Sequence, residues 1–283
     1  MKIDPFFARI IIAQNWKGSL AKCRIVIKQM IKLWPNNTKV GFILTCGGFM
    51  KFTWPNAING TLTQQEILAI LIVEAEKYIK MLINQPIRIK LKNITDYISI
   101  GIDSSNSKYP YKSIELVALY DLSDNRIFWT GKSYPTIYQQ KELIKYTDLK
   151  SHFVKTKYGK TLILGCHDLN IFSPRVKATV KNWRKKLVSD YKDLVIKKHP
   201  SIVIQHPHTT DSHRIWISAL SGLFKYDFVK YFCSAGKYYN HGNKCRAKLS
   251  IVLIKTIKGS SFDFVFKNKL KLLKFKIYTT SVK

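Results

Sequence analysis

The residue whose position most clearly suggests chemistry is a single cysteine that follows an apolar segment. Residues 161–165 predict a fully buried strand, and Cys166 comes directly after it. In α/β folds the loop at the carboxyl end of such a strand often holds the reacting groups. A cysteine there can act as a nucleophile, and from position alone it can equally be a small hydrophobic residue of the core.

The residues around Cys166 are TLILGCHDLNIFSPR, and they resemble the nucleophile motif of the nitrilase, or carbon–nitrogen hydrolase, superfamily. That motif contains a strand, a Cys, an aromatic residue, an Asp and a short Phe-Pro stretch, and here His167 stands at the aromatic position. The upstream sequence WTGKS resembles the lysine motif of the family and places Lys132 34 residues before Cys166. Glu142, 24 residues before Cys166, stands where the superfamily carries its second, substrate-positioning Glu.

The resemblance covers roughly residues 10–223, with a weaker trace through residue 255. It implies a four-layer α-β-β-α sandwich with two mixed sheets, formed by residues 1–255. Residues 256–283 fit the family poorly and are expected to form a basic C-terminal extension. The resemblance also implies an amide or nitrile as a small-molecule substrate, a homodimer or larger oligomer, and no organic cofactor.

The chemistry of the matched residues explains why they would act together. A thiol with a pKa near 8.5 is mostly protonated at neutral pH, so an ammonium close to Cys166 favours the thiolate. The Lys132 ammonium can also stabilise the oxyanion that forms when sulfur attacks an amide or nitrile carbon. The resemblance makes the backbone N–H of His167 the second oxyanion donor, and a carboxylate base would accept the thiol proton.

The sequence departs from the family at that general base. Thr45 and Cys46 occupy the place of the Pro-Glu pair of the family, and neither a hydroxyl nor a thiol is an effective proton acceptor at pH 7. Loss of a general base typically costs about 10² to 10⁴ in rate. The departure therefore leaves two alternatives, a hydrolase with weak activity and an inactive binding or regulatory protein that keeps the pocket.

Three replacements for the base can be named from the sequence. They are Glu142, a carboxylate recruited from Glu66 or Glu115, and the neighbouring His167. Glu66 is better explained by a capping box with Thr63, and Glu115 by a solvent-facing strand position. Adjacent strand residues point apart, so His167 is expected to pack beside the site rather than to pair with the thiol.

A second polar cluster, QHPHTTDSH, follows the predicted strand 201–205. His206, His208, Asp211 and His213 have the types and spacing of metal ligands. A strand-to-helix loop with Asp211 as the helix N-cap explains the same residues, and no metal site is predicted. Because this strand is expected to neighbour the strand before Cys166, His206 or His208 is predicted to line the pocket.

Composition limits the function classes. The 283 residues carry a net charge of +31, and 40 of the 48 basic residues are Lys. This charge predicts nonspecific attraction to polyanions, whereas base-reading proteins rely on the Arg forks that are scarce here. A basic nucleic-acid-associated protein is therefore a third alternative. Five dispersed cysteines and the lack of a long apolar run predict a cytoplasmic protein without a membrane span.

The elements that must position these residues alternate along the chain. Strand-like stretches are expected at residues 10–14, 40–45, 97–103, 114–122, 125–131, 161–165, 201–205, 228–234, 248–255 and 263–267, and 97–131 reads as an antiparallel meander. Helices are expected at residues 20–34, after Thr63, after Pro174 and after Asp211. The last residues fit either an edge strand or a basic tail.

Overall fold

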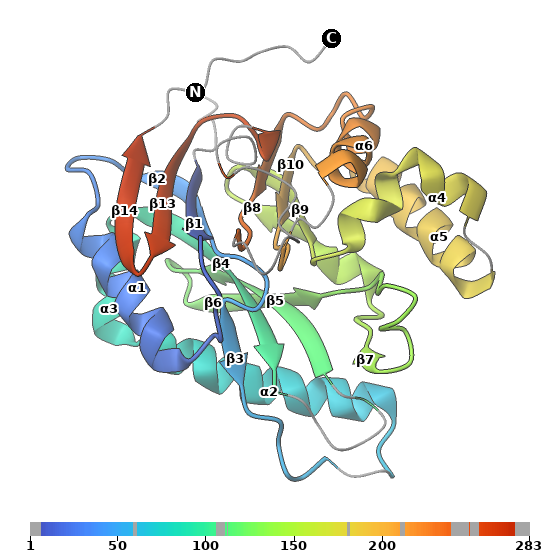
Figure 1. The fold of residues 1–283 in the computed structure, drawn as a ribbon, viewed down its shortest axis with the longest axis horizontal. Coiled ribbons are helices and arrows are strands. Elements are labelled where there is room, and N and C mark those ends of the chain that lie inside the picture. The colour runs from blue at the N-terminus through green and yellow to red at the C-terminus, as the bar shows by residue number, and fades with distance from the viewer. Residues whose placement is uncertain are drawn as a thin grey trace.

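The computed structural model describes residues 7–58, 61–105, 111, 113–179, 182–209, 213–238, 249 and 255–274. Two β-sheets lie at its centre, and helices cover them on the outside (Figure 1). The strands are β1 (Phe7–Ile12), β2 (Val40–Leu44), β3 (Met50–Phe52), β4 (Thr95–Ser104), β5 (Ser113–Asp121), β6 (Arg126–Gly131), β7 (Leu143–Ile144), β8 (Phe153–Thr156), β9 (Gly159–Leu164), β10 (Ile202–Gln205), β11 (Tyr231–Ser234), β12 (Ile257–Lys258), β13 (Ser261–Lys267) and β14 (Lys269–Lys274). The helices are α1 (Leu20–Lys32), α2 (Gln64–Leu82), α3 (Gln85–Lys92), α4 (Pro174–Thr179), α5 (Asn182–Lys198) and α6 (His213–Leu223), with short 3₁₀ turns at Leu149–His152 and Asp168–Phe172.

Both sheets mix parallel and antiparallel pairs. The larger has the order β14-β13-β1-β2-β4-β5-β6, with β3 paired to β4 and β7 to β5. Strands β13, β1, β2 and β4 run parallel, whereas β4, β5 and β6 form the predicted antiparallel meander. The smaller sheet has the order β12-β11-β10-β9-β8, with three parallel strands between two antiparallel edge strands.

Alternation along the strands produces the layers. In β1, Ala8, Ile10 and Ile12 join the core under α1, α2 and α3. The intervening Phe7 and Ile11 face the smaller sheet and join the core between the sheets. A third core lies between the smaller sheet and α4, α5 and α6, and it includes Tyr191, Trp216 and Phe232. The predicted α-β-β-α sandwich with two mixed sheets is confirmed.

The helices begin largely where the sequence indicates. The capping box at the start of α2 is confirmed, since the Thr63 side chain accepts from the Glu66 N–H and the Glu66 carboxylate accepts from the Thr63 N–H.

The single helix expected after Pro174 is two helices, α4 and α5, and Asn182 at the start of α5 has a positive φ of 53°. Helix α3 was not predicted. The predicted Asp211 cap and nearly all of the strand expected at residues 248–255 lie outside the described residues.

The C-terminal strands complete the larger sheet. Strand β13 pairs in parallel with β1, and β14 pairs antiparallel with β13 at the edge. The structure therefore places residues 261–274, assigned from the sequence to a separate extension, in the same sheet as β1. Of the two alternatives for the last residues, the edge strand applies to Lys269–Lys274. No described helix has the length and apolar character needed to cross a bilayer.

A buried ion pair ties the two ends of the chain together between the sheets. Arg9 on β1 is fully buried and forms a bidentate pair with Asp263 on β13, at 2.6 and 2.7 Å. Its guanidinium also donates to the carbonyl of Ser234 on the smaller sheet, at 3.3 Å. The Arg9 guanidinium thus binds groups of β13 and β11 at the same time and joins the two sheets.

Removing one partner of this pair should be costly. We expect Asp263→Asn to lower the free energy of unfolding by about 3 to 5 kcal/mol, because it leaves the Arg9 charge buried without a counter-ion. Urea denaturation followed by circular dichroism measures the change. The control Glu74→Gln breaks the exposed Lys77–Glu74 pair and should cost about 1 kcal/mol or less. Equal losses in the two variants would contradict the structural role of Arg9.

Candidate active site

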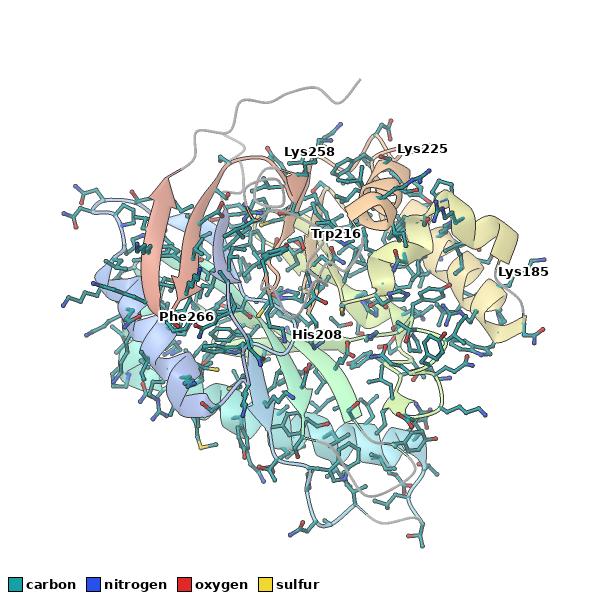
Figure 2. The ribbon with its side chains drawn as sticks, viewed as in Figure 1. Lys185, His208, Trp216, Lys225, Lys258 and Phe266 are labelled. Atoms are coloured by element: carbon teal, nitrogen blue, oxygen red, sulfur yellow. The ribbon has the colours of Figure 1, made fainter. Side chains whose placement is uncertain are left out.

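Five ionisable side chains from both sheets meet where several strands end. Cys166 follows β9 and His208 follows β10 in the smaller sheet. Lys132 follows β6, Glu115 lies near the start of β5, and Asp103 is the penultimate residue of β4 in the larger sheet. Figure 2 shows His208 at the centre of the molecule, between the two sheets.

The side chain of Asp168 fixes the position of Cys166 relative to Lys132. This fully buried carboxylate accepts from the N–H groups of Ser133 and Tyr134, at 3.1 and 2.7 Å, and from that of Gly165, at 2.9 Å. A Cβ atom added at Gly165 would lie 2.9 Å from the Lys132 Cα. Asp168 therefore joins the residues after Lys132 to the residue before Cys166, and a glycine allows the two backbones to touch.

The ammonium of Lys132 is buried and held by two side chains. Its Nζ lies 3.0 Å from Glu115 Oε1 and 2.7 Å from Gln139 Oε1, and the residue is only 2% exposed. Burial lowers the pKa of Lys132, but the charges of Cys166 and Glu115 outweigh it, and the pKa is raised. Lys132 therefore stays protonated next to the thiol.

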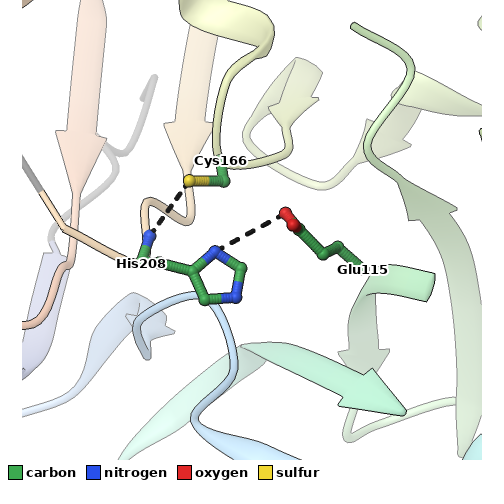
Figure 3. A group of neighbouring side chains, drawn as sticks. All are labelled: Glu115, Cys166 and His208. Carbon is green, nitrogen blue, oxygen red and sulfur yellow. Dashed lines mark hydrogen bonds and ion pairs between the residues drawn. The ribbon is translucent and has the colours of Figure 1, made fainter. Parts of the chain in front are cut away.

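His208 connects Cys166 to two carboxylates. Its backbone N–H donates to Cys166 Sγ at 3.2 Å, its Nε2 lies 2.7 Å from Asp103 Oδ2, and its Nδ1 lies 3.5 Å from Glu115 Oε2. A ring nitrogen of His208, the Cys166 sulfur and a Glu115 oxygen lie within 4.8 Å of one another. Figure 3 shows the imidazole and the carboxylate converging below the sulfur.

These contacts shift the pKa values in opposite directions for thiol and imidazole. Burial opposes the thiolate, but His208 and Lys132 together lower the pKa of Cys166 below its ordinary value. Burial also opposes the imidazolium, but Asp103, Glu115 and Cys166 raise the pKa of His208 well above its ordinary value. Burial raises the pKa of Asp103, but His208, with the charges of Lys237 and Lys51, lowers it below its ordinary value. The arrangement favours a thiolate beside an imidazolium.

The carboxylate next to Lys132 is Glu115 and not Glu142. The side chain of Glu142 is exposed, and its backbone carbonyl accepts from Ser113. Gln139, three residues earlier, reaches the Lys132 ammonium instead. The prediction that the Glu115 side chain faces solvent was wrong, because this side chain is only 12% exposed and its Oε2 is buried, with no hydrogen bond to any described residue.

The other residues selected from the sequence lie around this group. The ring of His167 stacks on Tyr134 with centroids 5.8 Å apart, and burial, with the charges of Lys132 and Arg184, lowers its pKa to about 4. His206 is buried between Ser99 Oγ and the carbonyl of Thr45, at 2.8 and 2.7 Å, so its ring links the two sheets. Burial raises the pKa of Cys46 to about 11.

A glycine explains how close the chain approaches the Asp103–His208 pair. Gly48 has a φ of +58°, and a Cβ atom there would lie 2.4 Å from Asp103 Oδ2 and 3.0 Å from His208 Nε2. The Gly47-Gly48 turn after β2 thus packs against the charged group, and a side chain at position 48 would displace the carboxylate from the imidazole.

Glu115, Cys166 and His208 are also the described residues that could together hold a metal ion. Thiolate, imidazole and carboxylate are suitable zinc ligands, and Asp103 is placed to orient the imidazole. However, a metal would have to replace the proton favoured on His208 and would approach the Lys132 ammonium, which already pairs with Glu115. The donor set therefore fits an ion-pair network better than a metal centre.

Sequence reasoning missed Asp103, Gln139 and the linking role of Asp168. Asp103 comes near the end of β4, after a run of buried residues, and a polar residue at that place marks a strand end that faces a site. Asp168 belongs to the nucleophile motif, but two of its three backbone partners, Ser133 and Tyr134, lie in a segment that only the fold brings next to it. Glu115 stood among the candidates, and its place near the start of a strand next to β4 was the usable signal.

Comparisons with known proteins find similarity in structure and none in sequence. No protein-family model and no curated protein matches the sequence. A solved amidase from Nesterenkonia sp. is similar in structure, with a TM-score of 0.46 and 10% identity over 81% of this chain and 75% of that chain. A carbon-nitrogen hydrolase from Helicobacter pylori G27 gives a TM-score of 0.45 and 12% identity over 82% and 73% of the two chains. These TM-scores and identities are low. The architecture given above therefore rests on the sheet order and the three cores of this chain, and not on the two solved structures.

The pKa shifts predict selective alkylation of one cysteine. Iodoacetamide reacts with thiolates, so Cys166 should be modified at pH 7 much faster than the buried Cys23, Cys46 and Cys233, whose pKa values are raised. Because the pKa of Cys166 is lowered, its reaction should persist as the pH falls below about 8.5 and decline only below the lowered pKa.

Peptide mass spectrometry over a pH series measures this profile for each cysteine. The His208→Ala variant should move the Cys166 profile towards higher pH, because it removes the imidazolium that lowers the pKa. A wild-type midpoint at or above about 8.5, or a profile that His208→Ala leaves unchanged, would contradict the thiolate–imidazolium arrangement.

Proposed function

We propose that this protein is a divergent carbon–nitrogen hydrolase of the nitrilase superfamily that cleaves an amide through Cys166. The observation that carries the proposal is the convergence of the Cys166 sulfur, a His208 ring nitrogen and a Glu115 oxygen within 4.8 Å, with the Lys132 ammonium on the same carboxylate. The motif resemblance around Cys166 and Lys132 and the α-β-β-α architecture support the family assignment.

The charge state of this group offers an answer to the missing general base. A base is needed when the nucleophile begins as a thiol, because its proton must leave before sulfur attacks. Here the lowered pKa of Cys166 and the raised pKa of His208 both favour the proton on the imidazole before substrate binds. Asp103 on Nε2 holds the imidazolium in place, as the carboxylate of a catalytic triad does.

In the acylation step the Cys166 thiolate attacks the amide carbon and a C–S bond forms. The carbonyl oxygen becomes an oxyanion, stabilised by the Lys132 ammonium and by the backbone N–H of His167. Collapse of this intermediate breaks the C–N bond, and the leaving nitrogen takes the proton from His208. The products of the step are an amine and a thioester on Cys166.

In the deacylation step the now neutral His208 accepts a proton from water. The water oxygen attacks the thioester carbon, the C–S bond breaks, and a carboxylic acid leaves. The thiolate and the imidazolium are restored together. Glu115 keeps Lys132 charged and oriented through both steps, and its Oε2 faces Nδ1 of His208.

Thr45 and Cys46, which stand at the position expected for the general base, have other roles in the structure. Thr45 Oγ1 accepts from the N–H of Gly101 at 3.1 Å, and the Cys46 thiol, with a pKa of about 11, stays protonated at neutral pH. We therefore assign the acid–base role to His208, which approaches the sulfur from the smaller sheet, and leave Cys46 as a buried residue beside the site.

Hydrolysis of a panel of small aliphatic and aromatic amides, followed by ammonia release, tests the proposal. Cys166→Ser should abolish turnover, and His208→Asn should lower kcat/KM by about 10² to 10⁴. A covalent acyl group on Cys166, trapped from the wild type by acid quenching and located by mass spectrometry, is the expected intermediate. Activity that survives Cys166→Ser, or no acylation with any amide, would contradict the proposal.

The two glutamates give a matched comparison. Glu115→Gln should lower kcat/KM by about 10², because it removes the counter-ion that positions Lys132. Glu142→Gln makes the same chemical change at an exposed position and should leave kcat/KM unchanged. The reverse order of effects would assign the site carboxylate to Glu142.

A further inference from the structure

The outer face of the larger sheet carries a charge distribution that the hydrolase site does not use. Helices α1 and α3 lie side by side on this face (Figure 1). The 13 residues of α1 and the eight residues of α3 contain no Asp or Glu. They contain seven basic residues, namely Lys22, Arg24, Lys28, Lys32, Arg88, Lys90 and Lys92.

A groove of about 660 Å³ runs between the two helices. Four cations line it, namely Arg24, Lys28, Lys32 and Lys90, together with Ile31, Asn84, Pro86 and Ile87. No carboxylate is among the residues that line it, and among the described residues no ion pair involves Lys28, Lys32 or Lys90. Within the described part of the chain no paired carboxylate neutralises the charge of these three lysines, so an anion bound in the groove would be stabilised.

Aliphatic side chains project beside these cations. Ile25 of α1 and Ile89 of α3 are 51% and 52% exposed. Ile25 is three residues before Lys28 and seven before Lys32, so it lies on the same side of α1 as these two lysines. Ile89 similarly follows Pro86 by three residues on α3. The face thus combines positive charge with half-exposed apolar side chains.

From this combination we propose that the α1–α3 face docks on an anionic phospholipid bilayer. Lipid phosphates would occupy the groove between the cations, and Ile25 and Ile89 would enter the boundary between headgroups and acyl chains. A nucleic acid would satisfy the cations but would leave the isoleucines in water, and α1 and α3 expose no aromatic side chain on which bases could stack.

The opposite helical layer provides a matched control surface. Helix α5 is also rich in lysine, but it contains Asp190 and Asp193, and Lys186 pairs with Asp190 at 3.0 Å. Lys185 and Lys197 on this helix are exposed. Reversing these two charges changes the net charge of the protein as much as reversing Lys28 and Lys32 does, without touching the proposed docking face.

Co-sedimentation of the full chain with vesicles tests the proposal at physiological ionic strength. We expect binding to vesicles that contain phosphatidylglycerol and little binding to pure phosphatidylcholine. The Lys28→Glu/Lys32→Glu double variant should bind at least ~25-fold more weakly, since each lysine near the surface contributes about fivefold. The Lys185→Glu/Lys197→Glu control should bind much more strongly than this variant.

A second variant distinguishes binding to a bilayer from binding to a nucleic acid. Ile25→Ser/Ile89→Ser should weaken vesicle binding severalfold and leave the salt-dependent binding of duplex DNA unchanged. Equal losses in the two charge-reversal variants would show that only the net charge acts, and would overturn the docking face. Vesicle binding that is insensitive to the isoleucine variant, with tighter binding of DNA, would assign the face to a nucleic acid. Retained amide hydrolysis and unchanged circular dichroism would show that each variant is folded.

Discussion

Charges that leave water must be compensated by other charges, and this constraint shapes the site. Thiolate, ammonium and carboxylate groups are each costly to bury alone. Here Cys166, Lys132, Glu115, His208 and Asp103 form a group in which each charge has a neighbour of opposite sign. Each partner therefore determines the protonation of the next, and the low pKa of the thiol is a property of the group as a whole.

The four-layer architecture is what allows such a group to form. The members of the charged group lie in β4 and β5 and just after β6 in one sheet, and in the segments that follow β9 and β10 in the other. The apolar core between the sheets sets their separation, and two buried polar links hold them in register. Asp168 joins the loop after β9 to the segment after β6, and Arg9 joins β1 and β13 to the carbonyl of Ser234. The site is thus built between two sheets that these polar links join.

The sequence predicts the features that depend on local pattern. Short apolar runs identified most long strands, Thr63 and Glu66 marked the start of α2, and the motif order selected Cys166 and Lys132. The sequence alone could not predict that the Glu115 side chain faces inwards, because this orientation depends on how β5 pairs with β4 and β6. The same holds for Asp103 and for the short strands β3, β7 and β12, whose pairing rather than composition defines them.

The positive charge of the protein is also organised by the layers and is not only a matter of composition. The outer helices are rich in lysine, but α5 includes two aspartates and α2 includes three glutamates, whereas α1 and α3 include no acidic residue. The α1–α3 layer covers the face of the larger sheet that points away from the smaller sheet, whereas the Cys166 group lies between the sheets. The larger sheet therefore separates the two features, so an anionic surface bound by α1 and α3 would leave the inter-sheet site uncovered.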